Sequence, residues 1–166
     1  MEKGITLLEL IICLAIISAI GAVSAPPLKK FIAEQSVTSD VNLLVNVINT
    51  ARSKSITQKV PIQICGIQPD NSCSRNWRKL IVSEPDSKTV LYTQSLNNSY
   101  EKVYWSAFQR KPGLTMMPNG FTGHQNGTLY LCHKNYPSLH RALIVAKSGK
   151  ITITQSSKKI QKQCSY

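Results

Sequence analysis

The feature that most limits the fold of this chain is an apolar stretch at its N-terminus. Residues 10–25 carry no charge, and together with residues 5–9 they form a run of 21 residues. As an α-helix this run is about 32 Å long, which matches the roughly 30 Å hydrocarbon core of a bilayer. We therefore expect residues 5–27 to form a transmembrane helix. A secretory signal peptide is the alternative, because Val23-Ser24-Ala25 is similar to a signal peptidase site.

Glu9 argues against the signal peptide, because a carboxylate inside a membrane helix is costly and usually has a function and a partner. Residues 4–10 read Gly-Ile-Thr-Leu-Leu-Glu-Leu, which resembles the prepilin peptidase signature of type IV pilins and type II secretion pseudopilins. The family usually has Phe where this chain has Ile5. The resemblance implies that residues 1–4 are a leader, that prepilin peptidase cleaves between Gly4 and Ile5, and that the new N-terminus is methylated. It also implies that Glu9 pairs with the N-terminus of a neighbouring subunit, an ion pair that fixes register.

The chain beyond the apolar run predicts an α+β fold. Pro26-Pro27 is expected to end or kink the membrane helix. Apolar residues then recur at steps of three and four, which predicts an amphipathic helix over residues 28–58: Val37, Val41, Leu44, Ile48 and Ala51. Residues 59–166 contain short apolar runs between Pro, Gly and Asn turns, so we expect seven or eight antiparallel strands packed on this helix. The pilin resemblance implies the same architecture.

Four cysteines of the predicted body, Cys65, Cys73, Cys132 and Cys164, permit three disulfide pairings. Cys65 and Cys73 flank a turn-rich loop, so a local bond between them is easy, and Cys132 would then pair with Cys164. A zinc site is the alternative, but C-x2-C spacing is absent from the sequence. We read the remaining cysteine, Cys13, as a small apolar residue of the membrane helix.

The cysteines also bear on topology, because disulfides form in the bacterial periplasm and at the cell surface. Only Lys3 precedes the apolar run, whereas Lys29 and Lys30 follow it, so the positive-inside rule alone would place the body in the cytoplasm. The cysteines and the pilin resemblance outweigh this. We expect a single-pass protein of the bacterial inner membrane, with a periplasmic body that reaches the cell surface in a pilus filament.

The sequence does not predict an enzyme. His124, His133 and His140 lack the spacing of metal ligands, and the chain has no nucleophile or nucleotide-binding motif. All eight acidic residues lie at or before Glu101, and those in the predicted body lie in or beside turn-like stretches. We therefore expect no catalytic residue, metal or cofactor.

The C-terminal part of the chain carries charge of one sign. Residues 102–166 contain ten Lys and Arg and no acid, within a chain of net charge +12. Such a field favours a polyanionic partner. Ser148-Gly149 is read as a two-residue hairpin turn, and the residues after the hairpin as a flexible tail held by Cys164. The candidate DNA-binding residues are Lys134, Arg141, Lys147, Lys150, Lys158, Lys159 and Lys162.

Several motifs of the body resemble the FimT/GspH-type minor pilins and pseudopilins. They are Ile64-Cys65, Cys73 followed by Trp77, Thr-Leu-Tyr-Leu-Cys at 128–132, and Ala-Leu-Ile-Val at 142–145. DNA-binding members carry Gly-Arg-x-Arg near the C-terminus, and this chain has Gly-Lys-Ile-Thr at 149–152, which keeps one cation.

Three functions follow from this resemblance. The first is a type IV minor pilin that binds double-stranded DNA non-specifically during natural transformation. The second is a GspH-like minor pseudopilin of a type II secretion system. The third is a structural pilus-priming or adhesion subunit without DNA binding. Other pilin subunits are expected partners in each case.

Overall fold

The computed structural model describes residues 6–70, 72–87 and 89–165, apart from the side chains of residues 22–26. The predicted processing site, Gly4 and Ile5, lies outside the described residues. The chain divides into two compact units, Met1–Gln35 and Ser36–Tyr166.

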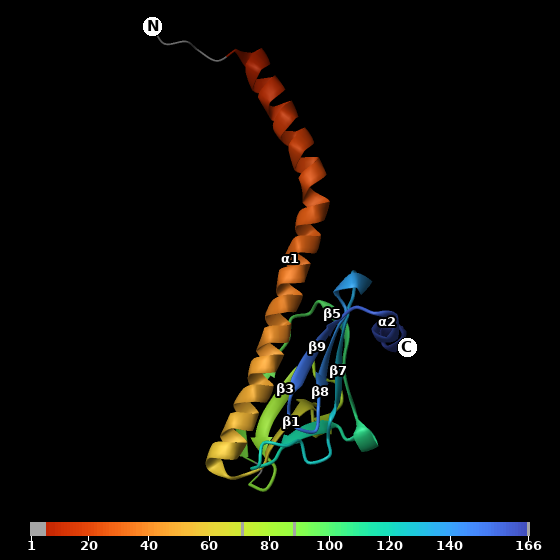
Figure 1. The fold of residues 1–166 in the computed structure, drawn as a ribbon. Helices are drawn as coiled ribbons and strands as arrows, with labels where there is room; N and C mark the ends of the chain where they lie inside the picture. The colour runs from red at the N-terminus through yellow and green to blue at the C-terminus, as the bar shows by residue number, and fades with distance from the viewer. Residues whose placement is uncertain (1–5, 71, 88, 166) are drawn as a thin grey trace. The chain divides into compact units, whose positions relative to one another are not determined.

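Helix α1 (Leu7–Gln58) is continuous over 52 residues (Figure 1). Of the two expectations at Pro26-Pro27, an end or a kink, the end is wrong because α1 passes through both prolines, whereas the predicted end at Gln58 is correct. The ring of proline fixes a helical φ, so a helix can pass through two prolines when the turns on either side keep their hydrogen bonds.

In the first unit the apolar side chains of α1 are exposed. Leu7 is 77% and Ile20 is 62% exposed, and Cys13 is exposed and unpaired. Among the described residues, however, no helix combines the length and the hydropathy that crossing a membrane requires.

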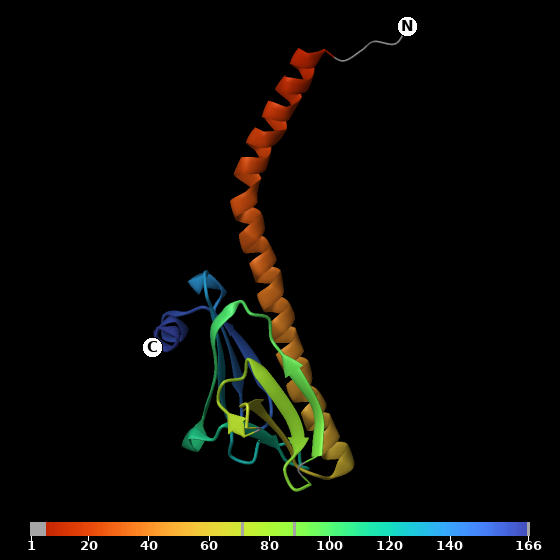
Figure 2. The same ribbon diagram turned by 180° about the vertical axis from the view of Figure 1, so that it is seen from behind.

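Two antiparallel sheets make up the β part of the second unit (Figures 1 and 2). The first sheet has the order β2-β1-β3-β4, with β6 also paired to β1: β1 (Ile62–Ile67), β2 (Cys73–Ser74), β3 (Lys79–Glu84), β4 (Thr89–Ser95) and β6 (Gly113–Met116). The second has the order β5-β7-β8-β9: β5 (Tyr100–Ala107), β7 (Gly127–His133), β8 (Arg141–Val145) and β9 (Ile151–Gln155). The predicted α+β architecture, a long N-terminal helix with an antiparallel β-rich body, is confirmed.

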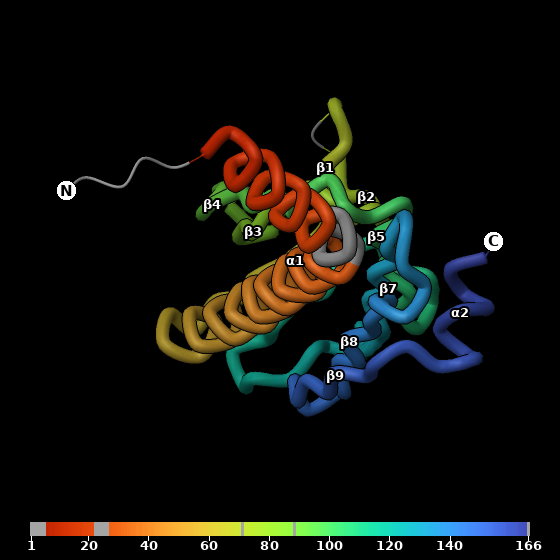
Figure 3. Tube along the Cα trace, turned by 90° about the horizontal axis from the view of Figure 1, so that it is seen from above, coloured from red at the N-terminus to blue at the C-terminus, as the bar shows by residue number. Residues whose placement is uncertain are grey.

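Three short helical elements complete the second unit. They are the 3-10 turns η1 (Phe108–Arg110) and η2 (Pro137–Leu139) and the C-terminal helix α2 (Lys158–Cys164), which lies beside β7 (Figure 3). Strand β6 was not expected, because Pro112-Gly113 is typical of a turn, whereas Gly113 opens a strand and pairs with Cys65 of β1.

The core lies between α1 and the sheets. The predicted apolar stripe from Val37 to Ala51 is buried, which confirms the amphipathic character of this half of α1. Trp77 and Trp105 stack at 4.9 Å between ring centroids, and both are fully buried. Ser55 of α1 donates a hydrogen bond to the carbonyl of Met116 at 2.8 Å. Burying one large apolar side chain contributes about 1.5–3 kcal/mol, so the stripe anchors the helix.

Both predicted disulfides are present. Cys65–Cys73 links β1 to β2 across a separation of 8 residues, and Cys132–Cys164 links β7 to α2 across 32 residues.

Candidate nucleic-acid interface

The positive charge of the protein belongs to the second unit. Residues 36–166 hold 17 of the 20 Lys and Arg and five of the eight acids, a net charge of +12, whereas residues 1–35 hold three of each. The five acids are not spread evenly. Asp40 is on α1, Asp70, Glu84 and Asp86 are in or beside the first sheet, and Glu101 is on β5. The second sheet and α2 therefore carry a single acid.

Helix α2 holds three of the predicted DNA-binding residues. Ser157 caps the helix by accepting a hydrogen bond from the Ile160 N–H at 3.4 Å. Ile160 is buried, and Cys164 is bonded to Cys132. At about 100° per residue, the lysines at 158, 159 and 162 lie on the side of the helix opposite Ile160 and Cys164, and all three are exposed. The flexible tail that the sequence predicted is thus a helix, because a cap, a buried isoleucine and a disulfide order it.

Arg141 and Lys134 lie at the same end of the second sheet. Arg141 pairs with Gln155, two residues before the cap of α2, and its Nη1 donates to the carbonyls of Ser138 and His140 at 3.0 and 2.9 Å. Lys134 is exposed, and its Nζ lies 3.3 Å from Asn98 Oδ1. We call these five cations (Lys134, Arg141, Lys158, Lys159 and Lys162) the α2 group.

Lys147 and Lys150 lie at the other end of the β8–β9 hairpin. The Gly149 N–H donates to the Ala146 carbonyl and the Ala146 N–H to the Lys150 carbonyl, both at 2.9 Å, while Gly149 has φ 77°. This is a three-residue loop with a glycine bulge, so the predicted two-residue turn is wrong. We call Lys147 and Lys150, together with Arg52 beside them, the turn group. A five-residue strand spans about 17 Å, and this length separates the turn group from Arg141.

The sequence analysis missed one cation of the turn group. The guanidinium of Arg52 packs against the backbone at Gly149 and at Gly120. A Cβ atom added to Gly149 would lie 3.1 Å from Arg52 Nε, and one added to Gly120 would lie 3.3 Å from the same atom. Arg52 is on α1, almost 100 residues before the turn, and no local pattern connects the two.

His133 and His140 form a buried pair in the turn between β7 and β8. His140 Nδ1 accepts the His133 N–H at 3.0 Å, and His133 Nδ1 accepts the N–H groups of Asn135 and Tyr136 at 3.1 and 3.2 Å. These bonds place the ring proton on Nε2 of each neutral imidazole. Burial lowers the pKa of both side chains, and the positive charge of Arg141 lowers that of His140 further. His124 is exposed.

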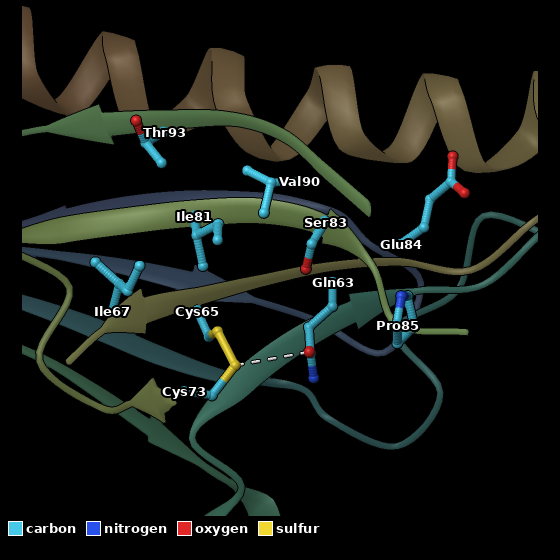
Figure 4. A pocket seen from close by; sticks show the side chains of 10 residues that line it. All are labelled: Gln63, Cys65, Ile67, Cys73, Ile81, Ser83, Glu84, Pro85, Val90 and Thr93. Carbon is cyan, nitrogen blue, oxygen red and sulfur yellow. Dashed lines mark hydrogen bonds between the residues drawn. A yellow bond between two sulfur atoms is a disulfide. The ribbon is translucent and has the colours of Figure 1, made fainter. Parts of the chain in front are cut away.

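The outer face of the first sheet is hollowed by a groove of about 560 Å³ (Figure 4). Ile81, Val90 and the Cys65–Cys73 disulfide line it, together with Glu84, and Gln63 Oε1 lies 3.6 Å from Cys73 Sγ. Among the described residues of this lining the one charged side chain is the Glu84 carboxylate, which would repel a polyanion.

Comparison with known proteins gives one family and one fold. Residues 40–149 match the model of the family described as type II transport protein GspH. No curated protein matches the chain by sequence. Two crystal structures of the type IV minor pilin FimU of Pseudomonas aeruginosa (strain PAO1) are similar to it, each at 20% identity. The match to the P21 crystal form has a TM-score of 0.60 and covers 77% of this chain and 95% of the FimU chain. The match to the P65 crystal form has a TM-score of 0.56 and covers 73% of this chain and 94% of the FimU chain.

Proposed function

Since the chain belongs to the family of the type II transport protein GspH, we propose that it is a type IV minor pilin that binds double-stranded DNA non-specifically during natural transformation. The observation that carries this proposal is the excess of positive charge on the second sheet and α2, which carry a single acid, Glu101 of β5. A regular duplex presents closely spaced phosphates, and Lys and Arg bind them by releasing counterions, whatever the base sequence.

The geometry of the two cation groups suits a duplex. The α2 group and the turn group are separated by about 17 Å, which equals about five base pairs at the rise of B-DNA. Among the described residues, Lys147, Lys150, Lys158, Lys159 and Lys162 form no ion pair and are exposed, so little has to be broken before they reach phosphates.

The salt dependence of DNA affinity tests this proposal. We would measure the fluorescence anisotropy of a labelled duplex of about 20 base pairs with the full chain in neutral detergent. Four engaged phosphates give a slope of log K against log salt near −3.6, so a fourfold rise in salt should weaken binding roughly a hundredfold. Replacing Lys158, Lys159 and Lys162 by Gln should flatten the slope by about 2.7. The charge-matched control is the triple Gln variant at Lys29, Lys30 and Lys79, which should bind as the wild type does.

The second candidate is a GspH-like pseudopilin of a type II secretion system, which the family description favours. A structural priming or adhesion subunit is the third. Absence of DNA binding at low salt would refute the first proposal in favour of these two. No enzymatic activity is proposed.

We further propose that the N-terminal helix inserts in the inner membrane after cleavage between Gly4 and Ile5, with the body in the periplasm. The exposed apolar side chains of α1 between Leu7 and Ile20 support this, because none of the residues described in the first unit covers them. In a filament the same surface would contact other pilin subunits.

Glu9 has hydrogen-bond partners in its own chain. Its Oε2 accepts hydrogen bonds from the Thr6 N–H and hydroxyl at 3.1 Å each, and the Glu9 N–H donates to Thr6 Oγ1 at 3.3 Å. This is a capping box, in which Gln can replace Glu. The cap and the proposed pairing with a neighbouring subunit can therefore be separated experimentally.

Two substitutions separate these roles. Glu9→Gln keeps the cap but removes the charge, and Glu9→Leu removes both. If Glu9 pairs with the N-terminus of a neighbour, both variants should be processed normally and both should be depleted from sheared filaments. Normal incorporation of Glu9→Gln would show that the cap alone matters. Substitution of Gly4 should instead block processing, seen as an unchanged precursor mass.

A further inference from the structure

A second cationic feature of the body is a cleft between the end of β2 and η1, with a volume of about 510 Å³. Arg75 lines it from the segment after β2, and Arg110 lines it from η1. The uncharged side chains of Ser74, Asn76 and Tyr104 line it as well. Neither arginine belongs to the α2 group or the turn group, and neither stands in a sequence pattern that indicates a binding site.

The backbone around Arg75 is held firmly. Its carbonyl accepts the Trp105 N–H at 2.8 Å, and the Trp77 N–H donates to the Val103 carbonyl at 3.0 Å, so this segment pairs with β5. Gly66 of β1 lets the backbone at Asn76 pass close to it, because a Cβ atom at position 66 would lie 1.8 Å from the Asn76 carbonyl oxygen.

The side chain of Arg75 is also oriented. Its Nη1 donates to the Tyr104 hydroxyl at 2.9 Å. One guanidinium carries five N–H groups, so most of them remain for a ligand in the cleft.

Arg110 reaches the cleft through a strained turn. Gln109 and Arg110 have φ values of 57° and 55°, two consecutive left-handed residues without glycine. Each such residue costs of order 1–3 kcal/mol and persists only where the surrounding structure holds it. The Phe108 N–H, which donates to the Asn126 carbonyl at 3.1 Å, fixes the start of this turn. Conformations of this kind cluster at ligand sites.

The lining defines the class of ligand. None of the described residues that line the cleft carries a carboxylate, so the two guanidinium charges are not neutralised there. The planar fork of Arg matches the oxygens of a phosphate group with two parallel hydrogen bonds. We propose that the cleft of Arg75 and Arg110 binds a phosphate of the DNA backbone. This assignment rests on the proposed function and adds a site with defined geometry to the lysine groups.

Arginine-to-lysine exchange tests the cleft, because it keeps the charge and removes the forks. With the full chain in detergent and the same duplex, Arg75→Lys/Arg110→Lys should weaken binding about tenfold, because the charge is kept and the paired hydrogen bonds of each fork are lost. Arg75→Gln/Arg110→Gln should weaken it more and flatten the salt slope by about 0.9, the share of one phosphate. The control Lys29→Gln/Lys30→Gln loses the same charge and should match the wild type. Unchanged thermal melting of the lysine variant would show that the fold is intact.

A small probe examines the cleft without the rest of the duplex. Titration of inorganic phosphate should shift the Nε–Hε NMR signals of Arg75 and Arg110, and Tyr104→Phe, which frees Arg75, should reduce the shift. If both arginine variants bind duplex as the control does, or if phosphate moves neither signal, the cleft is not a phosphate site, although the lysine groups can still bind DNA. If the wild type does not bind duplex even at low salt, the proposed function fails as well.

Discussion

The buried pair His133 and His140 makes the stability of the body sensitive to mild acid. Their Nδ1 atoms accept three backbone N–H groups, which hold the turn between β7 and β8 closed. A protonated imidazole has no acceptor, so protonation removes these bonds. Lowering the pH should therefore destabilise the folded state.

The sign and size follow from linkage. Burial lowers the pKa of both histidines in the folded protein below the ordinary value of 6.5, so the unfolded chain binds protons first as the pH falls. Stability is then complete above about pH 6.5 and falls between that value and the folded pKa. Each histidine can contribute at most about 1.4 kcal/mol for each pH unit below about 6.5, and only one such unit lies between about pH 7.5 and pH 5.5, so the pair can lose up to about 2.7 kcal/mol over this range.

Other groups nearby modify this response. The Glu101 carboxylate raises the pKa of His140, which opposes the effect of burial, whereas Arg141 lowers it. Burial raises the pKa of Asp40 above 3.8, so protonation of this carboxyl stabilises the fold as the pH falls through that range. Because protonation of Asp40 changes the stability in the opposite direction, the contribution of the two histidines has to be measured with a variant that lacks them.

Asparagine provides this variant, because its Oδ1 can accept the same N–H groups and does not titrate. Urea unfolding of wild type and His133→Asn/His140→Asn would be compared at several values between about pH 7.5 and pH 5.5. The wild type should lose stability towards the acid end, and the double variant should lose much less. An equal loss in both proteins, or a wild type that gains stability in acid, would refute the reasoning.

Two further changes test the packing of the body. Replacing Cys132 and Cys164 by Ser should lower the free energy of unfolding by about 3.7 kcal/mol from chain entropy and expose α2 to proteolysis, against about 2.6 kcal/mol for the shorter Cys65–Cys73 loop. Gly66→Ala should cost more than about 3 kcal/mol in thermal or urea unfolding, because its Cβ would overlap a backbone carbonyl, and a loss below about 1 kcal/mol would contradict so close an approach of the two segments.

Sequence patterns predicted the parts of the fold that depend on local periodicity. The stripe from Val37 to Ala51 predicted a buried helix face, and the turn-rich loop between Cys65 and Cys73 predicted a local disulfide; both are observed. The pairing of Cys132 with Cys164 followed by elimination. At Pro26-Pro27 the sequence left open whether the helix ends or kinks, and the structure excludes the end, because the cost of proline in a helix does not describe the turns around it.

The arrangement of the cations was beyond these patterns. The acid-free C-terminal part gave the correct sign of the surface, but Arg141 and Lys150 are close in sequence and lie at opposite ends of one hairpin. Arg75 and Arg110 are 35 residues apart and meet in one cleft only because the segment after β2 pairs with β5. Sequence distance and spatial distance are unrelated in antiparallel sheets with long connections, so charge counting finds a surface and not a site.

Whether α2 is folded depends on the redox state of the compartment, and the proposed DNA binding depends on α2. A seven-residue helix is too short to be stable in water by itself, and α2 buries one apolar side chain, Ile160. The Ser157 cap contributes about 1 kcal/mol, so most of the order must come from the bond between Cys164 and Cys132. In a reducing compartment that bond opens, and the three lysines of α2 would then lose conformational entropy on meeting phosphates. The α2 group is therefore a preformed DNA-binding surface only where disulfides persist, which agrees with the proposed location of the body in the periplasm.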